Sequence, residues 1–364
     1  MKKSAISLYT VLAFVTVFAV GCTGGGTDGG VFVTTDAMET WENKIFVQQD
    51  NRKTITIGTV DIEKIAVDQQ NPDTIYLATT ADGLWKTTNA GDQWTQLPVN
   101  PDRMRDIEIH PEDSDIVYSI KNQNIIKTSD GGETWEIVYT DKQAGAIITR
   151  IAIDWFNPSK VYAITSLGAV LVTEDDGGSW RVVQEMKNPL IGLEISPSDS
   201  RHVYVLELDK NIHRTLDGGT SWTELLDDDF DDEHRNARSV RQMIIDPNNG
   251  STLYVSSKYG IIKSTDTGDS WEYVSTLIEQ GADENLSIQA ITVEPGDSST
   301  IMFGIGNLLY VSTDGGTSWT TREDFPSSRR INSIVYHPET VDTMYIGVLK
   351  EEEKRGGFIT RPSN

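Results

Sequence analysis

Cysteine and histidine are scarce in this chain, and their scarcity excludes several kinds of site. The 364 residues include one cysteine, Cys22, so no disulfide can form within the chain. Five histidines are scattered without an H-x-x-x-H or similar spacing, and no nucleophile motif or phosphate-binding loop is present. His110 and His337 lie in repeated turns where other copies have Asp or Glu, so we expect turn residues there rather than metal ligands. The sequence therefore predicts no metal and no cofactor.

Basic residues are also few. Lys and Arg number 31 against 55 Asp and Glu, which gives a net charge of −24. Such a surface repels nucleic acid and anionic lipid head groups, and it favours a cationic partner. Part of the charge lies in the run DDDFDDE at residues 227–233. This run is either a solvated loop or a calcium site, and the lack of a spaced D-x-D-x-D-G pattern favours the loop.

A long apolar run stands at the N-terminus. It spans the 16 residues Ala5–Val20, which is short for a membrane-spanning helix and typical of a signal peptide. The run ends in AVGC, which resembles the bacterial lipobox, in which the cysteine is acylated and becomes the new N-terminus. We predict a lipoprotein signal peptide over residues 1–21, lipid attachment at Cys22 and a glycine-rich tether over 22–30. An ordinary secretory signal with an incidental cysteine is the alternative.

Two motifs recur in alternation along the rest of the chain. One is a turn ending in tryptophan, with copies 41 to 53 residues apart, a period typical of propellers and solenoids. The other is a pair of apolar runs around a turn rich in Asp, Asn, Pro and Ser, which predicts a hairpin. The turns are Thr34–Trp41, Thr87–Trp94, Thr128–Trp135, Thr173–Trp180, Thr215–Trp222, Ser264–Trp271 and Ser312–Trp319. The hairpins are Ile65–Ala78, Ile107–Ile120, Ile151–Ile164, Leu193–Leu206, Met243–Ser256, Ile291–Gly304 and Ile334–Gly347.

These pieces assemble into a ring of seven equal units. A short strand follows each hairpin, and a further strand begins near each tryptophan, so the unit is a four-stranded antiparallel sheet. We predict an all-β fold over residues 31–364, a single seven-bladed β-propeller whose last blade is closed by the N-terminal segment. The outer strand of that blade would come from around Trp41–Phe46. Its third strand is either Val31–Thr35 or Gly357–Arg361.

The residues of the repeated turn have structural roles. A short acidic or amide side chain can accept hydrogen bonds from amides just ahead of it, glycine suits positive φ, and tryptophan seals the blade with apolar surface. The first copy has Met38 in place of glycine, so we expect that turn to differ or to be strained. The alternative role for the tryptophans is stacking on sugars. The residues concerned are Asp36, Asn89, Asp130, Asp175, Asp217, Asp266 and Asp314 with Trp41, Trp94, Trp135, Trp180, Trp222, Trp271 and Trp319.

The pattern S/T-x-D-x-G-x-S/T-W, as in Ser312–Trp319, resembles the Asp-box, or BNR, repeat. This repeat occurs in sialidases, in two-propeller xyloglucan hydrolases, in the sortilin luminal domain and in photosystem II assembly factors. The resemblance implies a β-propeller with the box on the outer rim, away from any catalytic face. It implies little about activity.

No catalytic constellation stands out. The Arg-Ile-Pro segment of sialidases is missing, and the chain is long enough for one propeller only, whereas the xyloglucan hydrolases place two carboxylates between two propellers. We therefore favour a non-enzymatic binding or assembly module for a protein or glycan. A glycoside hydrolase of the sialidase or xyloglucanase type is the alternative, and a carbohydrate-binding protein without catalysis is a third possibility.

Long polar side chains precede or begin the first apolar run of six of the seven hairpins, where the chain enters the blade beside the central channel; the fourth has Gly192. We expect them to gather at one mouth of the channel and form a basic patch for an acidic peptide, a carboxylate or a sugar. The alternative is that the arginines pair with acidic neighbours across blades. The candidate ligand-binding residues are Lys64, Arg105, Arg150, Arg241, Gln289 and Asn332. The protein is expected to be a monomeric lipoprotein outside the cytoplasm, held on a membrane, without a nucleic-acid partner.

Overall fold

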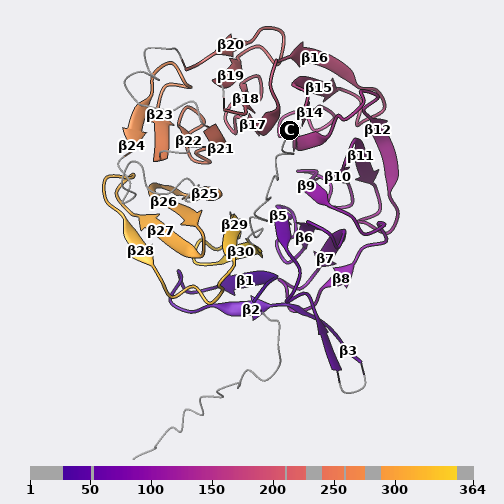
Figure 1. Ribbon diagram of the computed structural model, residues 1–364, viewed down its shortest axis with the longest axis vertical. Helices are drawn as coiled ribbons and strands as arrows, with labels where there is room; N and C mark the ends of the chain where they lie inside the picture. The colour runs from indigo at the N-terminus through magenta and orange to yellow at the C-terminus, as the bar shows by residue number, and fades with distance from the viewer. Residues whose placement is uncertain are drawn as a thin grey trace, which may run out of the picture.

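Seven four-stranded antiparallel sheets stand around a central axis as the blades of a propeller (Figure 1). The computed structural model describes residues 28–50, 53–209, 211–226, 240–257, 260–274 and 288–350. The prediction of a single seven-bladed propeller is confirmed. In these residues no helix has the length and apolar character needed to cross a membrane. The predicted signal peptide, Cys22, most of the tether and the acidic run 227–233 lie outside the described residues.

Each blade has the same order of strands from the channel outward. The first strands are β5 (Ile62–Val67), β9 (Met104–Ile109), β13 (Ile148–Ile153), β17 (Leu190–Ile195), β21 (Val240–Ile245), β25 (Ala290–Glu294) and β29 (Arg330–Tyr336). The second strands are β6 (Ile75–Thr79), β10 (Val117–Lys121), β14 (Val161–Thr165), β18 (Val203–Glu207), β22 (Leu253–Ser257), β26 (Asp297–Ile305) and β30 (Met344–Leu349).

The two outer strands follow the same plan. The third strands are β7 (Leu84–Thr87), β11 (Asn124–Thr128), β15 (Ala169–Thr173), β19 (Asn211–Thr215), β23 (Gly260–Ser264), β27 (Leu308–Ser312) and β1 (Val31–Thr34). The fourth strands are β8 (Thr95–Gln96), β12 (Glu136–Thr140), β16 (Arg181–Glu185), β20 (Thr223–Glu224), β24 (Glu272–Val274), β28 (Thr320–Arg322) and β2 (Glu42–Lys44). An additional hairpin, β3 (Phe46–Asp50) and β4 (Lys53–Thr56), stands outside the ring (Figure 1).

The core is a set of apolar layers between blades. One layer unites Tyr118 and Ile120 of β10 with Ile151 and Ile153 of β13, and similar layers lie between the other blades. Second strands such as β14 are buried along their whole length, because both faces of each blade pack against a neighbour. Runs of β-branched and aromatic residues suit such strands. First strands alternate buried and partly exposed residues, because one side of each borders the channel.

The N-terminal segment closes the ring. Strand β1 pairs with β30 on one side and β2 on the other, and Phe32 lies opposite Ile346 and Asn43. The rings of Phe32 and Trp41 both pack edge-on against Phe325, with centroids 5.1 Å away in each case. Val31–Thr34 therefore supplies the third strand of the closing blade, and the predicted closure is confirmed. The other candidate, Gly357–Arg361, lies outside the described residues.

The repeated turn is held by one aspartate and one hydroxyl group. In the last copy, Oδ1 of Asp314 accepts hydrogen bonds from the Ser312 hydroxyl (2.9 Å) and the Ser318 N–H (2.8 Å). The Ser312 hydroxyl also accepts the Gly316 N–H at 2.8 Å. Asn89 accepts the equivalent bonds in the second copy through its amide oxygen. Each fourth strand then begins at the residue after the tryptophan.

Each turn contains two successive residues with positive φ. Glycine occupies the second position in six copies, where it also packs tightly against the previous blade: a Cβ on Gly268 would lie 2.6 Å from a methyl of Leu225. Met38 adopts φ 72° at this position, and its N–H still donates to Thr34 as the glycines donate to their own hydroxyl partners. The first turn is therefore strained rather than different in form.

A carbonyl group in each of four turns fastens its blade to the preceding one. Tyr118 Oη and Lys127 Nζ both donate to the carbonyl oxygen of Asp176, at 2.8 and 2.9 Å. Tyr76 with Lys86, Tyr162 with Lys160 and Tyr204 with Arg214 bind Gly131, Gly218 and Thr267 in the same way. The three lysine ammonium groups also lie over the rings of their tyrosines. We call this arrangement the interblade clamp.

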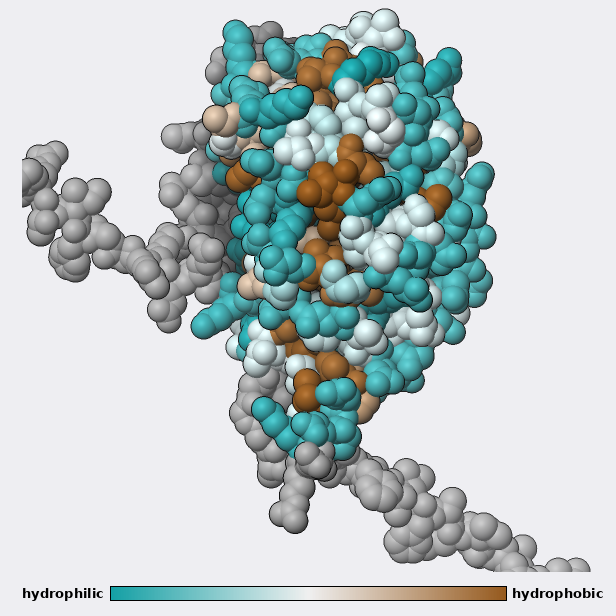
Figure 2. Space-filling model, turned by 90° about the vertical axis from the view of Figure 1, so that its right-hand side faces the viewer, coloured by the Kyte–Doolittle hydropathy of each residue, from teal (hydrophilic) through white to brown (hydrophobic). Residues whose placement is uncertain are grey.

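Both ends of the described chain lie at the end of the ring where the first strands begin. Asp28 accepts hydrogen bonds from Ser327 and Ser328, just before β29, and the Lys350 N–H donates to Asp61, just before β5. The outer rim carries some exposed apolar side chains (Figure 2), among them Ile137 on β12 and Val182 on β16.

Replacing Ser312 by alanine should lower the free energy of unfolding by about 1–3 kcal/mol, because the buried N–H of Gly316 loses its acceptor. Urea denaturation measures the loss. The matched control is Ser312→Thr, which keeps the hydroxyl, gives the threonine found in five other copies and should change the free energy by about 0.5 kcal/mol or less. Equal losses in the two variants would contradict this role for the hydroxyl.

Replacing Phe32 by alanine should lower the free energy of unfolding by about 3–5 kcal/mol, because it leaves a cavity in the closing blade. Phe46→Ala is the control, since Phe46 is exposed on the outer hairpin, and it should cost about 1 kcal/mol or less. Ring closure by β1 would be unimportant for stability if both variants melted at the same temperature.

Acid should unfold the protein between about pH 4 and pH 2. Hydrogen bonds from hydroxyl and amide groups lower the pKa of Asp130, Asp217, Asp266 and Asp314 from 3.8 to about 2. Their folded-state pKa is depressed, so their contribution to stability is present above about pH 4 and is lost as the pH falls through the folded value. Thermal melts followed by circular dichroism test this. A variant with these four aspartates changed to asparagine, as in Asn89, should lose less stability over the same interval; an equal loss would refute the assignment.

Candidate functional site

A cavity of about 600 Å³ runs along the central channel. It extends from Arg103 and Arg330, where the first strands begin, to Pro247 and Pro295, where the first turns begin. We call the end with the arginines the mouth. The structure brings all six candidate ligand-binding residues to the lining of this one cavity: Lys64, Arg105, Arg150, Arg241, Gln289 and Asn332.

Bulges in the first strands turn these side chains toward the mouth. The register of the first strand against the second shifts near its start in six of the seven blades, for example between Ile62 and Lys64 and between Val240 and Gln242. The extra residue in those two blades is Glu63 and Arg241. A bulge leaves its extra residue outside the ladder and re-aims the side chain, which is common beside functional sites.

Equivalent positions of the first strands form three rings at increasing depth. The mouth ring, at the bulge or, for Gln289, just before β25, contains Glu63, Arg105, Thr149, Ile191, Arg241, Gln289 and Asn332. The middle ring, one residue further along, contains Lys64, Asp106, Arg150, Gly192, Gln242, Ala290 and Ser333. The deep ring, two residues beyond the middle ring, contains Ala66, Glu108, Ala152, Glu194, Ile244, Thr292 and Val335.

Three of the six candidates are held by neighbouring groups. The Asn332 amide donates to the carbonyl oxygens of Ile62 and Glu63, at 3.1 and 2.9 Å, and so bridges two blades. Arg241 forms an ion pair with Asp209 of the preceding blade at 2.6 Å. Lys64 lies 3.9 Å from Asp106. The expected cross-blade pairing of arginines with acidic residues therefore holds for Arg241.

Arg105 and Arg150 are placed differently. Within the described part of the chain, neither has a carboxylate at ion-pair distance; Arg150 donates to the Thr149 carbonyl at 2.8 Å. The Nε–H groups of Arg103, Arg105 and Arg330 are buried there without a hydrogen-bond partner. Burial and the nearby charge of Arg103 lower the pKa of Arg105. The mouth therefore brings several arginine side chains close together, and some of their N–H donors have no acceptor in the described residues.

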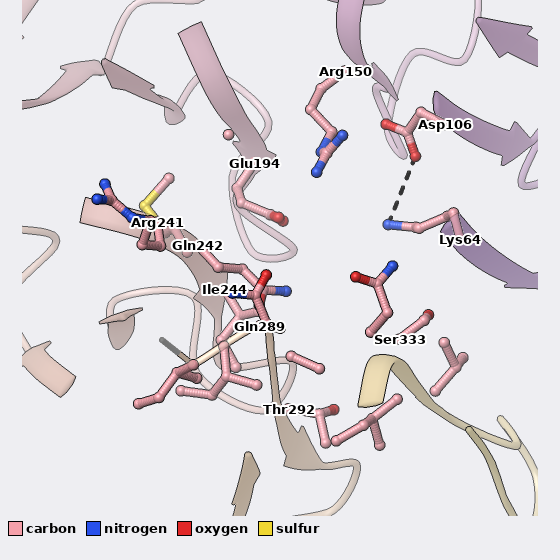
Figure 3. A pocket seen from close by; sticks show the side chains of 18 of the residues that line it. Lys64, Asp106, Arg150, Glu194, Arg241, Gln242, Ile244, Gln289, Thr292 and Ser333 are labelled. Atoms are coloured by element: carbon pink, nitrogen blue, oxygen red, sulfur yellow. Dashed lines mark ion pairs between the residues drawn. The ribbon is translucent and has the colours of Figure 1, made fainter. Parts of the chain in front are cut away.

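Carboxylates that sequence reasoning missed lie deeper in the channel. Burial raises the pKa of Glu194 to about 7, with Asp106 adding to the shift and Lys64 opposing it. Burial also raises the pKa of Glu108, against the opposing effect of Lys64. Asp106, Arg150 and Glu194 point with Lys64 into one space (Figure 3). The alternation of apolar and acidic residues in DIEI and LEI marks Glu108 and Glu194 in the sequence, but among 55 acidic residues that signal is weak.

Below the mouth, the channel has a charged half and an uncharged half. The strands β5, β9, β13 and β17 carry the charged middle and deep residues. At the same two depths, β21, β25 and β29 line the channel with uncharged side chains, including Ile244, Thr292 and Ser333 (Figure 3). Such a lining can hold a ligand that combines charge with apolar surface.

His110 and His337 are turn residues, as expected, whereas His213 lies in β19 with its Nε2 2.8 Å from Glu207. Nδ1 of His110 and of His337 accepts the N–H of Glu112 and Glu339 at 3.2 Å, as the Asp154 carboxylate does for Phe156 in an equivalent turn. Across the described ranges, no group of three or more His, Cys, Asp or Glu is arranged to hold a metal ion.

Comparison with known proteins points to propellers of several activities. A family model, Sortilin-Vps10 (sortilin, neurotensin receptor 3), matches residues 123–230. A xyloglucanase from Paenibacillus sp is 24% identical over 292 residues, which cover 72% of this chain and 26% of that enzyme. A xyloglucanase from Hypocrea jecorina is 26% identical over 223 residues, covering 58% and 24%. The chain therefore spans about a quarter of the length of these curated relatives.

Solved structures share the fold at low sequence identity. YCF48 from Cyanidioschyzon merolae has a TM-score of 0.61 at 15% identity and covers 79% of this chain and 95% of its own. YCF48 bound to a D1 peptide has a TM-score of 0.62 at 18% identity, covering 84% and 99%. The GH74 xyloglucanase from Xanthomonas campestris has a TM-score of 0.65 at 14% identity, covering 80% and 51%. The chain is a seven-bladed β-propeller, its repeated turns resemble the Asp-box, or BNR, repeat, and it is similar to these relatives in sequence or fold.

Proposed function

We propose that this propeller is a non-enzymatic binding or assembly module that takes an acidic segment of a partner protein at the channel mouth. The observation that carries the proposal is the gathering of Arg103, Arg105 and Arg330 in the lining of one cavity, with Nε–H groups that have no acceptor in the described residues. A guanidinium group has five N–H donors, so side chains that line a cavity with donors left over can bind a ligand carboxylate. Guanidinium groups match carboxylates in shape as well as charge.

The electrostatics of the molecule favour this choice of ligand. The protein as a whole carries a net charge of −24, so a crowded group of arginines is a local exception to its surface. A concave site lined by one sign of charge concentrates ligands of the other sign. YCF48, whose fold is similar and whose length this chain nearly matches, has been solved bound to a D1 peptide. That structure supports a peptide as the kind of ligand.

The proposed setting is outside the cytoplasm, on a membrane. The N-terminal sequence supports acylation at Cys22 after removal of residues 1–21, and a glycine-rich tether would join the lipid to the propeller. A fold without disulfides suits either redox state. The proposal includes a monomer, a protein or glycan partner, and no nucleic acid.

A glycoside hydrolase acting on polysaccharide is the second candidate. Two observations favour it: the xyloglucanases among the relatives, and the channel carboxylates with raised pKa, since a general acid needs such a value. Release of reducing sugar from xyloglucan by the purified chain would establish this function and remove the first one. Binding of a glycan array without hydrolysis would select a carbohydrate-binding protein.

Removing Arg105 or Arg150 should weaken binding of a labelled hexaglutamate peptide by about 10- to 100-fold, which corresponds to the loss of one or two charge-assisted hydrogen bonds. Fluorescence anisotropy of the full chain with Arg105→Gln and Arg150→Gln measures this. The control is Arg201→Gln, which makes the same change of charge at an exposed turn beside Asp199 at the other end of the ring.

The affinity should fall as salt rises, because ion pairs at a partly open site are screened. Thermal melts show that each variant is folded. The proposal is wrong if hexaglutamate binds the wild-type chain no better than hexaglutamine does, or if Arg201→Gln weakens binding as much as the two mouth variants.

A further inference from the structure

The order of charges along the channel indicates more than an acidic ligand. Excess positive charge lies at the mouth, where Arg103, Arg105 and Arg330 stand. The middle ring is mixed, with Lys64, Asp106 and Arg150. The titratable groups of the deep ring are both acidic, Glu108 and Glu194, and Glu194 lines the cavity. The sign of the charge therefore reverses with depth.

Pairing within the protein does not cancel this gradient. Glu63 is bonded to Arg103, Asp209 to Arg241, and Asp106 lies near Lys64. The nearest cations to the deep carboxylates belong to the middle ring, and in the described residues neither Glu108 nor Glu194 has a cation at ion-pair distance. Unpaired charges of both signs thus face one cavity, with positive ones outside and negative ones inside.

The distance between the middle ring and the deep ring is similar to the length of a lysine side chain. The middle and deep rings are two residues apart on each first strand, which is roughly 6–7 Å along the strand. A ligand lysine has an ammonium group on a flexible four-carbon stem, so it can reach the deep ring while its backbone stays near the mouth. The uncharged wall, with Ile244 and Val335 at this depth, offers apolar contact for the stem.

We infer that the ligand is a protein segment in which one basic residue stands between acidic residues, with its ammonium group beside Glu194 and the flanking carboxylates on Arg105 and Arg150. This inference rests on the proposed function and specifies the ligand of that site. It assigns Glu194 as the residue that selects the basic side chain.

The inference predicts that an acidic peptide with a central lysine binds more tightly than the same peptide with glutamine. The positive charge at the mouth alone predicts the reverse. A peptide with one lysine among glutamates has less negative charge than the same peptide with glutamine, so a purely basic site would bind the lysine peptide more weakly. A preference for the lysine peptide would therefore indicate that the lysine interacts with the acidic residues of the deep ring. The raised pKa of Glu194, about 7, adds a second signature, because protonation of the carboxyl removes the charge that attracts the ammonium group.

Two labelled peptides test the inference on the full chain at pH 8, one with three glutamates on each side of a lysine, the other with glutamine in place of the lysine. We expect the wild type to bind the lysine peptide about tenfold more tightly. Glu194→Gln should remove or reverse this preference. Glu112→Gln, which makes the same change in an exposed turn, should retain it. The preference in the wild type should also decline between pH 8 and pH 6.

The outcomes separate the two proposals. If both peptides bind the wild type equally, or the glutamine peptide binds better, the charge-order inference is overturned while the acidic-segment function stands. If neither peptide binds, the proposed function itself fails. If Glu194→Gln keeps the lysine preference and a thermal melt shows it folded, Glu194 is not the selecting residue. Glu194→Asp, which keeps the charge, should preserve a preference in the same direction.

Discussion

The carbonyl oxygen at the first left-handed residue of the repeated turn is the point where one blade is fastened to the next. A tyrosine and a cation from the preceding blade converge on it in four successive places, and the positive φ of that residue is what turns the carbonyl outward to meet them. The aspartate and hydroxyl of the turn hold this geometry, and the glycine that follows allows close approach of the neighbouring blade. The repeated residues thus serve contacts between blades as well as the blade that contains them. This explains why they recur around the ring without belonging to the channel.

The channel lining exists only because the ring is complete. Residues of all seven blades line the cavity, so no single sheet forms it or its gradient of charge. The seven blades share a backbone plan, yet their channel positions differ: a glutamate stands in β17 where isoleucine stands in β21 and threonine in β25. The fold therefore supplies a uniform frame, and a few substitutions at equivalent positions produce a polarised site. The first-strand bulges add to this, since they free the mouth residues from the ladder.

The fold was accessible from the sequence because its signal is repeated. Seven copies of the turn and the hairpin set the number of blades, and the position of the first tryptophan before any hairpin indicated closure by the N-terminal segment. The choice of Val31–Thr34 as third strand required the pairing of Phe32 with Ile346, which no local pattern reveals. The six candidate ligand-binding residues were found by counting back from the repeated hairpins. Glu108 and Glu194 were missed because their properties depend on burial and on Lys64 from another blade. Local sequence patterns do not predict which distant segments lie together. The interblade clamp was missed for the same reason.

Both described ends of the chain leave the ring on the side of the channel mouth. Five residues lie between Cys22 and Asp28, and the six Cα–Cα steps from one to the other span about 20 Å when fully extended. If Cys22 carries lipid as proposed, the linker tethers the propeller to the bilayer from the side that carries the channel mouth. The length of the linker then limits the distance between that side and the membrane surface. Segments that emerge just above a membrane surface would then meet the opening before any freely diffusing protein could enter from the side.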